Sequence, residues 1–281
     1  MKTDKRLGSY YKGSNFTGEN ITCDDMTYVN PSTFINDHCK VPITGDWNAD
    51  GEDAIGTYRM DLAHFCIDDA KIDYGNVSDI PIAGDWNGDG KDDIGVFRKY
   101  YSHEEGHTAF YWRINSGHNS IEFPPIEFGN KESIPVTGDW NGNGYDTIGV
   151  FDPLKGKFVL DFNHNGIANK SLFLRAQGST PIAGDWDGDG DDDIGIFKID
   201  EDEEAGTFYL DMDLTGRLVE YTVSVPLEER KDKSFNIPLV GDWDGDGDDD
   251  VGLYVSPARK IFIDISMDKM IDEPQQHKGK G

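Results

Sequence analysis

The chain has 281 residues, with 26 Lys and Arg against 54 Asp and Glu, so its formal net charge is −28. A surface this acidic repels the phosphates of nucleic acids and of anionic membranes, and no stretch is apolar and long enough to span a bilayer. We therefore expect neither nucleic-acid binding nor membrane insertion. Aromatic residues make up 12% of the chain and recur at fixed places, which predicts a folded rather than a disordered protein.

The first forty residues contain two short segments of strand-like composition, residues 26–29 and 32–35. Lys2, Lys5 and Arg6 near the start have no apolar run behind them, so no secretion signal is visible there. These forty residues precede the first copy of a repeated segment.

From residue 41 onward the chain repeats Gly-Asp-Trp-[Asn/Asp]-[Gly/Ala]-[Asp/Asn]-Gly-x-Asp-x-[Ile/Val]-Gly five times. The first aspartates of successive copies lie 39, 54, 46 and 57 residues apart, close to the length of a propeller blade and far longer than a β-helix coil. Five similar units argue for one repeat architecture rather than two ordinary domains. The acidic segments, called loops one to five below, are residues 46–54, 85–93, 139–147, 185–193 and 242–250.

Every repeat has the same order of predicted elements. An extended apolar segment (residues 80–86 in the second copy) leads into the loop, and a β-branched or aromatic strand (residues 94–98) follows it. After a variable turn come an alternating aromatic strand and one short last strand, a pattern typical of propeller blades, and no window has the 3.6-residue period of a helix. The predicted third strands are residues 64–67, 109–112, 157–160, 208–210 and 261–263.

The predicted fold is therefore all-β: a β-propeller of five four-stranded blades, with an acidic loop between the first and second strands of each blade. We expect residues 41–268 to form the propeller and residues 269–281 to form a flexible tail. Only three strands are clear after loop five, so we expect residues 1–40 to supply a closing strand that covers the exposed edge. The alternative is a degenerate sixth blade formed by residues 7–40.

Three cysteines, Cys23, Cys39 and Cys66, allow at most one internal disulfide. A bridge between Cys23 and Cys39 would close a short loop and leave Cys66 reduced in a predicted strand. Three unpaired thiols are the other alternative, and the sequence does not decide between the two.

The loops have the composition of a cation site. Counted from the first aspartate, positions 1, 3 and 5 carry oxygen-bearing side chains, position 6 is glycine and the carbonyl of position 7 can point inward, as in calcium loops with about six to eight oxygen ligands. An EF-hand also needs glutamate at position 12, and no copy has one. An acid at position 9 could close the site in loops two, four and five, but Ala54 and Thr147 replace it in loops one and three.

These segments resemble FG-GAP or VCBS-type repeats, the calcium-loop blades of integrin α-chain propellers, certain fungal lectins and many secreted microbial proteins. The resemblance covers roughly residues 40–268. It implies up to five calcium ions, held by the side chains at positions 1, 3, 5 and 9 and by the carbonyl at position 7. The implied ligands are Asp46, Asn48, Asp50 and Glu52 in loop one; Asp85, Asn87, Asp89, Lys91 and Asp93 in loop two; Asp139, Asn141, Asn143 and Tyr145 in loop three; Asp185, Asp187, Asp189, Asp191 and Asp193 in loop four; and Asp242, Asp244, Asp246, Asp248 and Asp250 in loop five.

The loops are not equivalent as sites. Carboxylates at positions 1, 3, 5 and 9 number two, three, one, four and four along the chain. Because calcium affinity follows ligand charge, we expect loops four and five to bind most tightly and loop three least. In loops one and three the aspartate at position 8, or a water, would have to replace the missing acid. The tryptophan at position 2 is expected to pack in the core against the neighbouring blade rather than to stack on a sugar.

One enzyme motif is matched in sequence: residues 103–107 read His-Glu-Glu-Gly-His, which fits the zinc-protease pattern. That chemistry needs both histidines on one face of a helix, whereas this segment lies in a predicted turn. The sequence has no nucleophile elbow or phosphate-binding loop, and the metal loops account for the carboxylates that a glycosidase or lyase would use. We expect a binding protein rather than an enzyme, with a polysaccharide lyase as the less favoured alternative.

Together the resemblance and the unequal turns predict an extracellular, calcium-stabilised propeller that recognises a protein or a glycan on one rim. One function that fits is a protein-interaction, adhesion or surface-assembly module, with self-assembly included, and the unequal turns favour it. The other is a calcium-dependent lectin, which aromatic pairs exposed between blades would favour. The calcium is expected to be structural, and weak sites imply an extracellular setting because cytosolic calcium is low.

Overall fold

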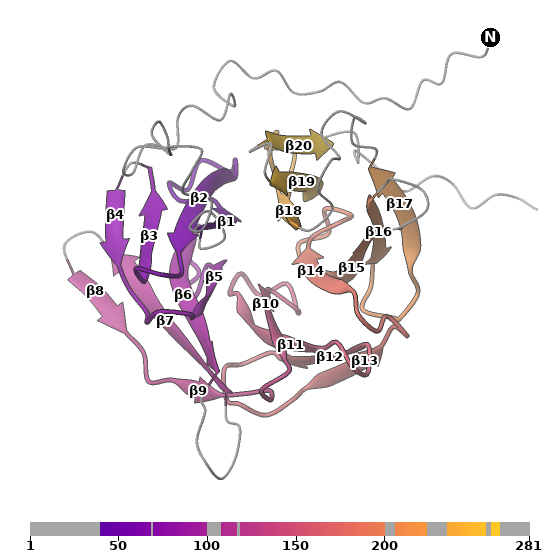
Figure 1. Cartoon of the computed structure of the whole chain (residues 1–281), viewed down its shortest axis with the longest axis horizontal. Coiled ribbons are helices and arrows are strands. Elements are labelled where there is room, and N and C mark those ends of the chain that lie inside the picture. The colour runs from indigo at the N-terminus through magenta and orange to yellow at the C-terminus, as the bar shows by residue number, and fades with distance from the viewer. Residues whose placement is uncertain are drawn as a thin grey trace, which may run out of the picture.

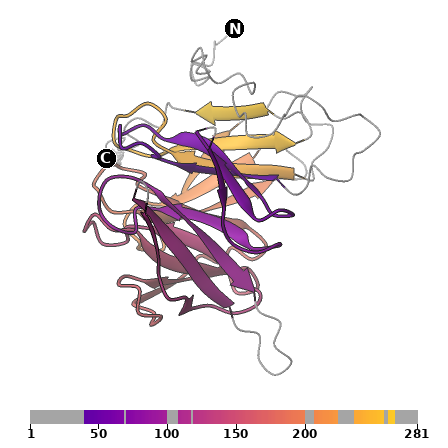
Figure 2. The same cartoon turned by 90° about the vertical axis from the view of Figure 1, so that its left-hand side faces the viewer.

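The computed structural model describes residues 40–68, 70–99, 108–116, 119–199, 206–223, 235–256 and 260–264. These residues form strands and turns, with no helix among them. The strands make five antiparallel sheets that are arranged around a central axis (Figure 1). A view turned by 90° shows the first sheet, in indigo, beside the last strands, in yellow (Figure 2). The predicted all-β propeller fold is confirmed.

The sheets follow the repeats in order. The first contains β1 (Lys40–Gly45), β2 (Ala54–Arg59), β3 (His64–Ile67) and β4 (Ala70–Asp73). The second contains β5 (Ile80–Gly84), β6 (Asp93–Lys99), β7 (Thr108–Ser116) and β8 (Asn119–Glu122), with β9 (Ile126–Glu127) paired to β7. The third contains β10 (Ile134–Gly138), β11 (Thr147–Asp152), β12 (Lys157–Asp161) and β13 (Lys170–Phe173). The fourth contains β14 (Thr180–Gly184), β15 (Asp193–Ile199), β16 (Gly206–Asp211) and β17 (Val219–Val223), and the fifth contains β18 (Phe235–Gly241), β19 (Asp250–Ser256) and β20 (Lys260–Asp264).

The first strand of each sheet lies nearest the axis (Figure 1). These strands, β1, β5, β10, β14 and β18, contact one another in that order, and β18 also contacts β1. Four sheets have at least four strands and form complete blades, whereas the fifth sheet has three among the described residues. The predicted closing strand or sixth blade before residue 40, and the predicted tail from residue 269, lie outside the described residues.

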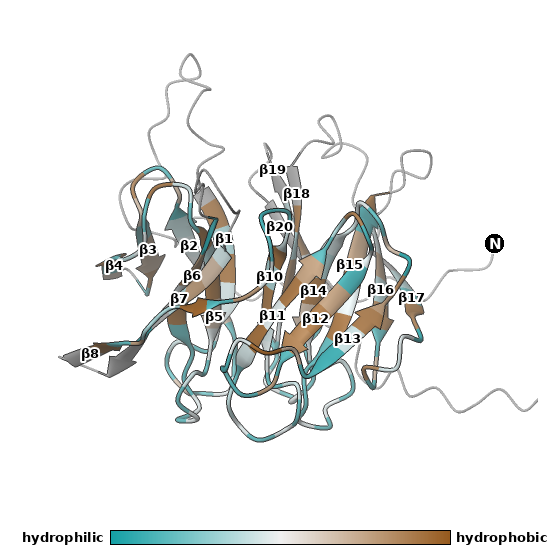
Figure 3. Cartoon of the chain, turned by 90° about the horizontal axis from the view of Figure 1, so that it is seen from below, coloured by the Kyte–Doolittle hydropathy of each residue, from teal (hydrophilic) through white to brown (hydrophobic). Residues whose placement is uncertain are grey.

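Burial follows the order of strands within a sheet. The second strands β6, β11 and β15 are buried along most of their length because neighbouring sheets cover both of their faces, which explains their run of β-branched and aromatic residues. The outer strands β4 and β13 alternate or are largely exposed. Hydrophobic residues accordingly concentrate in the strands and hydrophilic residues in the connecting loops (Figure 3).

The core lies between adjacent sheets. One cluster joins Trp47 of the first sheet to Ile94 and Val96 of the second, and another joins Trp186 of the fourth sheet to Val251 of the fifth. The tryptophan at position 2 of the loop is thus a core residue packed against the next sheet, as predicted. The five tryptophans are between 0% and 6% exposed: Trp47, Trp86, Trp140, Trp186 and Trp243.

Close packing of the strands explains why the repeat ends in glycine. A Cβ on Gly95 in β6 would lie 2.8 Å from Ile82 Cγ1 and 2.8 Å from the Tyr111 carbonyl oxygen. No real Cβ tolerates that distance, so the first and third strands can approach the second this closely only where it carries glycine.

Cys66 in β3 is buried and disulfide-bonded, and this finding corrects both predictions for the cysteines. A Cys23–Cys39 bridge that leaves Cys66 reduced is therefore wrong, and so are three unpaired thiols. Spacing along the chain does not tell which cysteines a fold brings within bonding distance. Cys23 and Cys39 themselves lie outside the described residues, as do the histidines of the protease-like motif, residues 103–107.

Candidate functional site

The five acidic loops connect the first and second strands of their sheets, and the first aspartate organises each loop. In loop two, Asp85 Oδ1 accepts the backbone N–H of Gly88 at 2.7 Å, and its Oδ2 accepts that of Gly90 at 2.7 Å. Gly88 and Gly90 have left-handed φ angles of 71° and 78°, which curl the backbone around the carboxylate. All five loops have positive φ at positions 4 and 6, and in loop one Ala49 adopts this conformation at position 4.

The aspartate at position 8 joins each loop to the next around the axis. Asp92 in loop two accepts the Asp46 N–H of loop one at 2.9 Å and donates its own N–H to the Asp46 carbonyl at 2.8 Å. The same reciprocal pair joins loop two to three, three to four and four to five. The Asp53 N–H donates to the Asp242 carbonyl at 2.7 Å, so loop five is joined to loop one. This connection between loops is a role that the sequence did not reveal.

The glycine before each loop makes room for this connection. A Cβ on Gly84 would lie 2.7 Å from Asp146 Oδ2, which accepts the Asp85 N–H of loop two at 2.7 Å. The Asp146 carboxylate is thus turned toward the neighbouring loop. Whether it also replaces the missing acid at position 9 of its own loop stays a prediction.

The aspartates at position 8 form a ring of carboxylates around the axis, and their pKa values are raised. Burial is the largest cause for all five, and repulsion from nearby carboxylates adds to it. The pKa rises to about 7 for Asp53 and for Asp146. Burial and mutual repulsion thus both disfavour the charged form of these carboxylates.

Loops four and five bring three carboxylates together. The ligand oxygens of Asp185, Asp187 and Asp189 lie within 4.8 Å of one another. Those of Asp242, Asp244 and Asp246 in loop five do the same. These two clusters could hold a metal ion, and within the described part of the chain no other loop groups three acids in this way.

The acid at position 9 lies beneath each of these clusters. Asp193 and Asp250 are 0% and 4% exposed, and the Oδ2 atom of each has no hydrogen-bond partner among the residues that the structure describes. Burial, followed by repulsion from Asp187, raises the pKa of Asp193 to about 9. Burial, followed by repulsion from Asp244, raises the pKa of Asp250 to about 8. An all-oxygen set with buried oxygens that lack a donor fits a hard divalent cation.

The other loops satisfy position 9 differently. In loop two, Asn87 Nδ2 donates to Asp93 Oδ2 at 3.0 Å. In loop three, Thr147 donates its hydroxyl to the Gly138 carbonyl at 3.2 Å, and Ala54 in loop one offers no polar side chain. The full ligand sets implied by the repeat resemblance stay predictions.

Two further turns share the backbone form of the loops, and sequence analysis missed them. They follow the third strands of the third and fourth sheets at residues 161–166 and 211–216. Asp161 accepts the Asn163 N–H at 3.0 Å and the Gly166 N–H at 2.6 Å. Asp211 likewise accepts the N–H groups of Thr215 and Gly216. Positions 4 and 6 of both turns have positive φ, as in the loops. The available signal was Asp-x-[Asn/Asp]-x-[Asn/Thr]-Gly without Gly-Asp-Trp.

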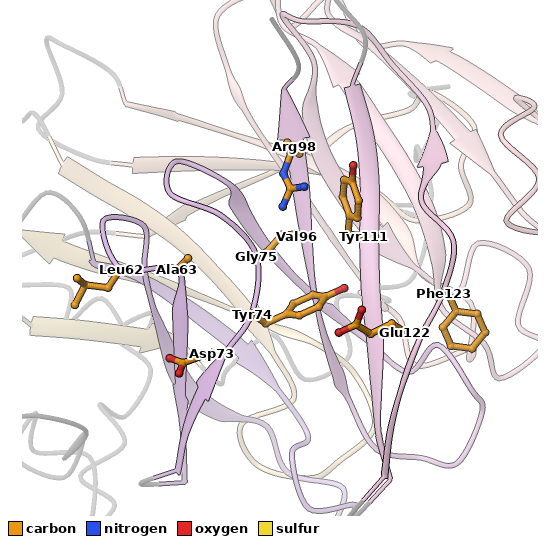
Figure 4. Close-up of a pocket in the computed structure, with 10 residues that line it drawn as sticks. All are labelled: Leu62, Ala63, Asp73, Tyr74, Gly75, Val96, Arg98, Tyr111, Glu122 and Phe123. Carbon is orange, nitrogen blue, oxygen red and sulfur yellow. The ribbon is translucent and has the colours of Figure 1, made fainter.

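A cavity of about 530 Å³ lies between the first and second sheets (Figure 4). Tyr74 comes from the end of the first sheet, and Tyr111 from β7 of the second. Figure 4 shows the Tyr74 ring and the Glu122 side chain directed toward each other, with Arg98 beside Tyr111. The lining residues are Leu62, Ala63, Asp73, Tyr74, Gly75, Val96, Arg98, Tyr111, Glu122 and Phe123.

The polar groups of this cavity are held in place. Arg98 Nη2 donates to Asp79 Oδ2 at 2.6 Å and its Nε donates to Oδ1 at 2.9 Å, and Asp79 is 2% exposed. The Arg98 guanidinium carbon lies 4.2 Å from the Tyr111 ring centroid, and that of Arg113 lies 4.9 Å from the Tyr74 centroid. Each tyrosine thus carries a guanidinium on one face, which orients the ring. Burial, followed by the charge of Glu122, raises the pKa of Tyr74 to about 12, so its hydroxyl keeps its proton.

The residues that match Arg98 and Tyr111 are different in the third and fourth sheets. In the third sheet, Asp152 and Val159 take the places of Arg98 and Tyr111 in the strand register. In the fourth sheet these places belong to Lys198 and Tyr209, with the lysine Nζ 5.6 Å from the ring centroid. The repeat therefore builds the scaffold of the cavity, while residues outside the repeat determine its chemistry.

The sequence matches no protein-family model. No curated protein matches it at a significant level. The resemblance to FG-GAP or VCBS repeats is therefore not established at the level of a family. None of the described residues forms a helix that is long and apolar enough to cross a membrane. Among solved structures, the chain is similar in fold to a lectin from Agrocybe aegerita, described as recognising non-reducing terminal N-acetylglucosamine; the TM-score is 0.39 at 13% identity, over 77% of this chain and 74% of the lectin chain.

Proposed function

We propose that this protein is a calcium-stabilised β-propeller that binds a carbohydrate in the cavity between its first and second sheets. The observation that carries the proposal is the pair of oriented tyrosines, Tyr74 and Tyr111, beside Arg98 and Glu122 in a cavity of about 530 Å³. Aromatic rings pack against the C–H face of a sugar, while fixed polar groups bind its hydroxyls. The volume lies within the range of small-molecule sites, about 300–1,000 Å³.

The charges of the cavity favour a neutral glycan. Among the described lining residues Arg98 is the one cation, and Asp79 already neutralises it; the Arg113 guanidinium on the Tyr74 ring adds one positive charge. Asp73 and Glu122 add two carboxylates to the wall. A uronate or another acidic sugar would meet net negative charge, which disfavours both an acidic ligand and a lyase acting on uronates. We therefore propose binding without catalysis.

The scaffold we propose is a ring of five blades, with β18–β20 as the fifth, held by calcium in its loops. Contact between β18 and β1 and the hydrogen bond from Asp53 to Asp242 support a closed five-membered ring. The acid clusters of loops four and five support two tight calcium sites, and the three weaker loops complete the predicted set. The disulfide at Cys66 supports an extracellular location, because disulfides persist in oxidising compartments.

A protein-interaction, adhesion or surface-assembly module is the second candidate function. Leu62 and Phe123 favour it, because these large apolar side chains at the cavity are 52% and 37% exposed. Exposed apolar groups beside a pocket are also common at protein interfaces. Self-association through this surface would be a special case of the same function.

The test is binding of the calcium-loaded protein to an array of neutral and acidic glycans, followed by affinity measurements on the best ligand. We expect saturable binding to a neutral glycan, weakened about tenfold by Tyr74→Ala and by Tyr111→Ala, since an aromatic contact contributes about 0.5–1.5 kcal/mol beyond its burial. Tyr209→Ala removes the matching tyrosine of the fourth sheet and should leave the affinity unchanged. Absence of glycan binding by folded protein, or equal affinities of all three variants, would overturn the proposal.

A further inference from the structure

The second and fourth sheets differ in one pair of opposed residues. The register of β5 and β6, continued by one residue, places Asp79 opposite Arg98, and the two form an ion pair of 2.6 Å. The register of β14 and β15 places Ser179 opposite Lys198 in the same way. Opposed residues of an antiparallel pair have their side chains on the same face of the sheet. The fourth sheet thus keeps the cation and lacks the internal acid.

These two residues of the fourth sheet have no polar partner within the described part of the chain. Ser179 is 5% exposed, and its Oγ atom has no hydrogen-bond partner. Lys198 is half-buried and forms no ion pair with a described residue. A buried hydroxyl without a partner is destabilising, and an anion is the one partner that could bind the hydroxyl and the ammonium together.

The third sheet satisfies the same two positions internally. Ser133 Oγ accepts the Asn130 N–H at 2.9 Å. In the register of β10 and β11, continued by one residue, Asp152 lies opposite Ser133, and it binds Lys155 Nζ at 2.7 Å. The fourth sheet therefore has an unpartnered hydroxyl and an unpaired cation where the second and third sheets have internal pairs.

Arg175 adds a second cation at this place. It matches Gly75, because each residue lies two places after an outer strand and has a left-handed φ, 51° for Arg175 and 89° for Gly75. A Cβ on Gly75 would lie 3.1 Å from Asp79 Oδ2. The Arg175 side chain therefore starts beside the space that the Asp79 carboxylate fills in the second sheet. Arg175 is exposed and forms no ion pair with a described residue.

This face of the fourth sheet packs against the third sheet, its neighbour in the ring (Figure 1). Ile196 of β15 is 1% exposed and belongs to one core cluster with Leu174, which directly precedes Arg175. Glu220 of β17 lies opposite Tyr209 in the register and adds one carboxylate to the same face. Two cations and one acid leave this junction with net positive charge among these residues, although the whole chain is acidic.

We propose that the fourth sheet has a second ligand site, where Ser179, Lys198 and Arg175 bind the carboxylate of a small ligand of the uronic acid class. The ligand carboxylate would take the place that Asp79 has in the second sheet, accepting from the Ser179 hydroxyl and the Lys198 ammonium. One negative charge per ligand suits the site, because the net charge of −28 disfavours polyanions. The site is separate from the cavity of the first and second sheets.

Titration with sodium glucuronate tests the site, with glucose as the neutral probe of the same ring and the backbone NMR signals of β15 and β16 as the readout. Five acidic residues, 200–204, follow β15 in the sequence. The titration is therefore made at about 0.15 M salt, where exposed charges more than about 8 Å apart are largely screened. We expect saturable shifts with glucuronate and affinity about tenfold higher than for glucose, since hydrogen bonds to charged groups are the stronger ones. Equal shifts with both sugars, or none with glucuronate, would overturn the proposal.

Variants assign the binding to these side chains. Ser179→Asp supplies the acid that Asp79 provides in the second sheet, so it should pair with Lys198 and abolish glucuronate binding. Lys198→Met should weaken binding about tenfold. Lys131→Met removes the same charge from an exposed side chain before β10 and should change the affinity less than about twofold. Undiminished binding by folded Ser179→Asp, or equal weakening by the two lysine variants, would overturn the assignment. Neither result would affect the neutral-glycan proposal, which concerns other residues.

Discussion

Loops two and four have the same backbone but satisfy their buried acid in opposite ways. Asp93 in loop two accepts the Asn87 amide at 3.0 Å. In loop four the residue matching Asn87 is Asp187, and within the described part of the chain Asp193 Oδ2 has no hydrogen-bond partner. Exchanging an amide for a carboxylate at position 3 therefore replaces a donor by another acceptor, and the buried acid loses its internal partner.

The conformation of a loop and its need for a cation thus depend on different residues. The first aspartate accepts the N–H groups of positions 4 and 6 in both loops at 2.7 to 2.8 Å, so the same hydrogen bonds curl both loops. The two loops differ in charge at position 3, Asn87 against Asp187, and at position 7, where loop two has a lysine and loop four an aspartate. Loop two is hydrogen-bonded internally, whereas loop four, and loop five with it, has a deficit that a divalent cation would fill.

The largest expected effect is that of removing calcium. Two tight sites at about one hundred times their dissociation constants would each stabilise the fold by about 2.7 kcal/mol. Since 1 kcal/mol shifts the melting temperature of a domain of this size by about 2–4 °C, excess chelator should lower it by about 10–20 °C. Scanning calorimetry with chelator, and again after calcium is restored, measures the shift. An unchanged melting temperature would refute a structural role for the ion.

Sequence periodicity predicted the scaffold well because each Gly-Asp-Trp loop marks the end of one strand and the start of the next. The third strand His64–Ile67 was predicted with the bounds that the structure has. The role of Asp92 was not predictable, since its partner Asp46 lies 46 residues away in the chain. Nor was the cavity, because Tyr74 and Tyr111 come from two different sheets and neither belongs to the Gly-Asp-Trp segment. Local patterns specify loops, and contacts between blades need the fold.

Asp193→Asn tests the comparison of loops two and four most directly. We expect it to change the free energy of unfolding in opposite directions without and with calcium. Without calcium it removes the cost of burying the Asp193 carboxyl, whose pKa is raised to about 9 by that burial, and should stabilise the fold by about 1–3 kcal/mol. With calcium it removes a ligand and should destabilise the fold. Urea unfolding in chelator and in excess calcium gives both values. Asp93→Asn is the matched control, and it should not stabilise the metal-free protein because Asp93 already accepts a hydrogen bond. Shifts of the same sign in both states would contradict the account of loop four.

Asn87→Asp sharpens the comparison by giving loop two the charge pattern of loop four at position 3. The new carboxylate would face Asp93 without the amide donor, so we expect the metal-free protein to lose about 1 kcal/mol, the cost of one unsatisfied buried acceptor. In return a further tight calcium site should appear, because affinity rises with ligand charge. Calorimetric titration counts the tight sites, and Asn48→Asp in loop one, where Ala54 occupies position 9, is the control that should gain less. A variant that loses stability without gaining affinity would show that position 3 alone does not distinguish the loops, and that the charge at position 7, Lys91 against Asp191, also matters.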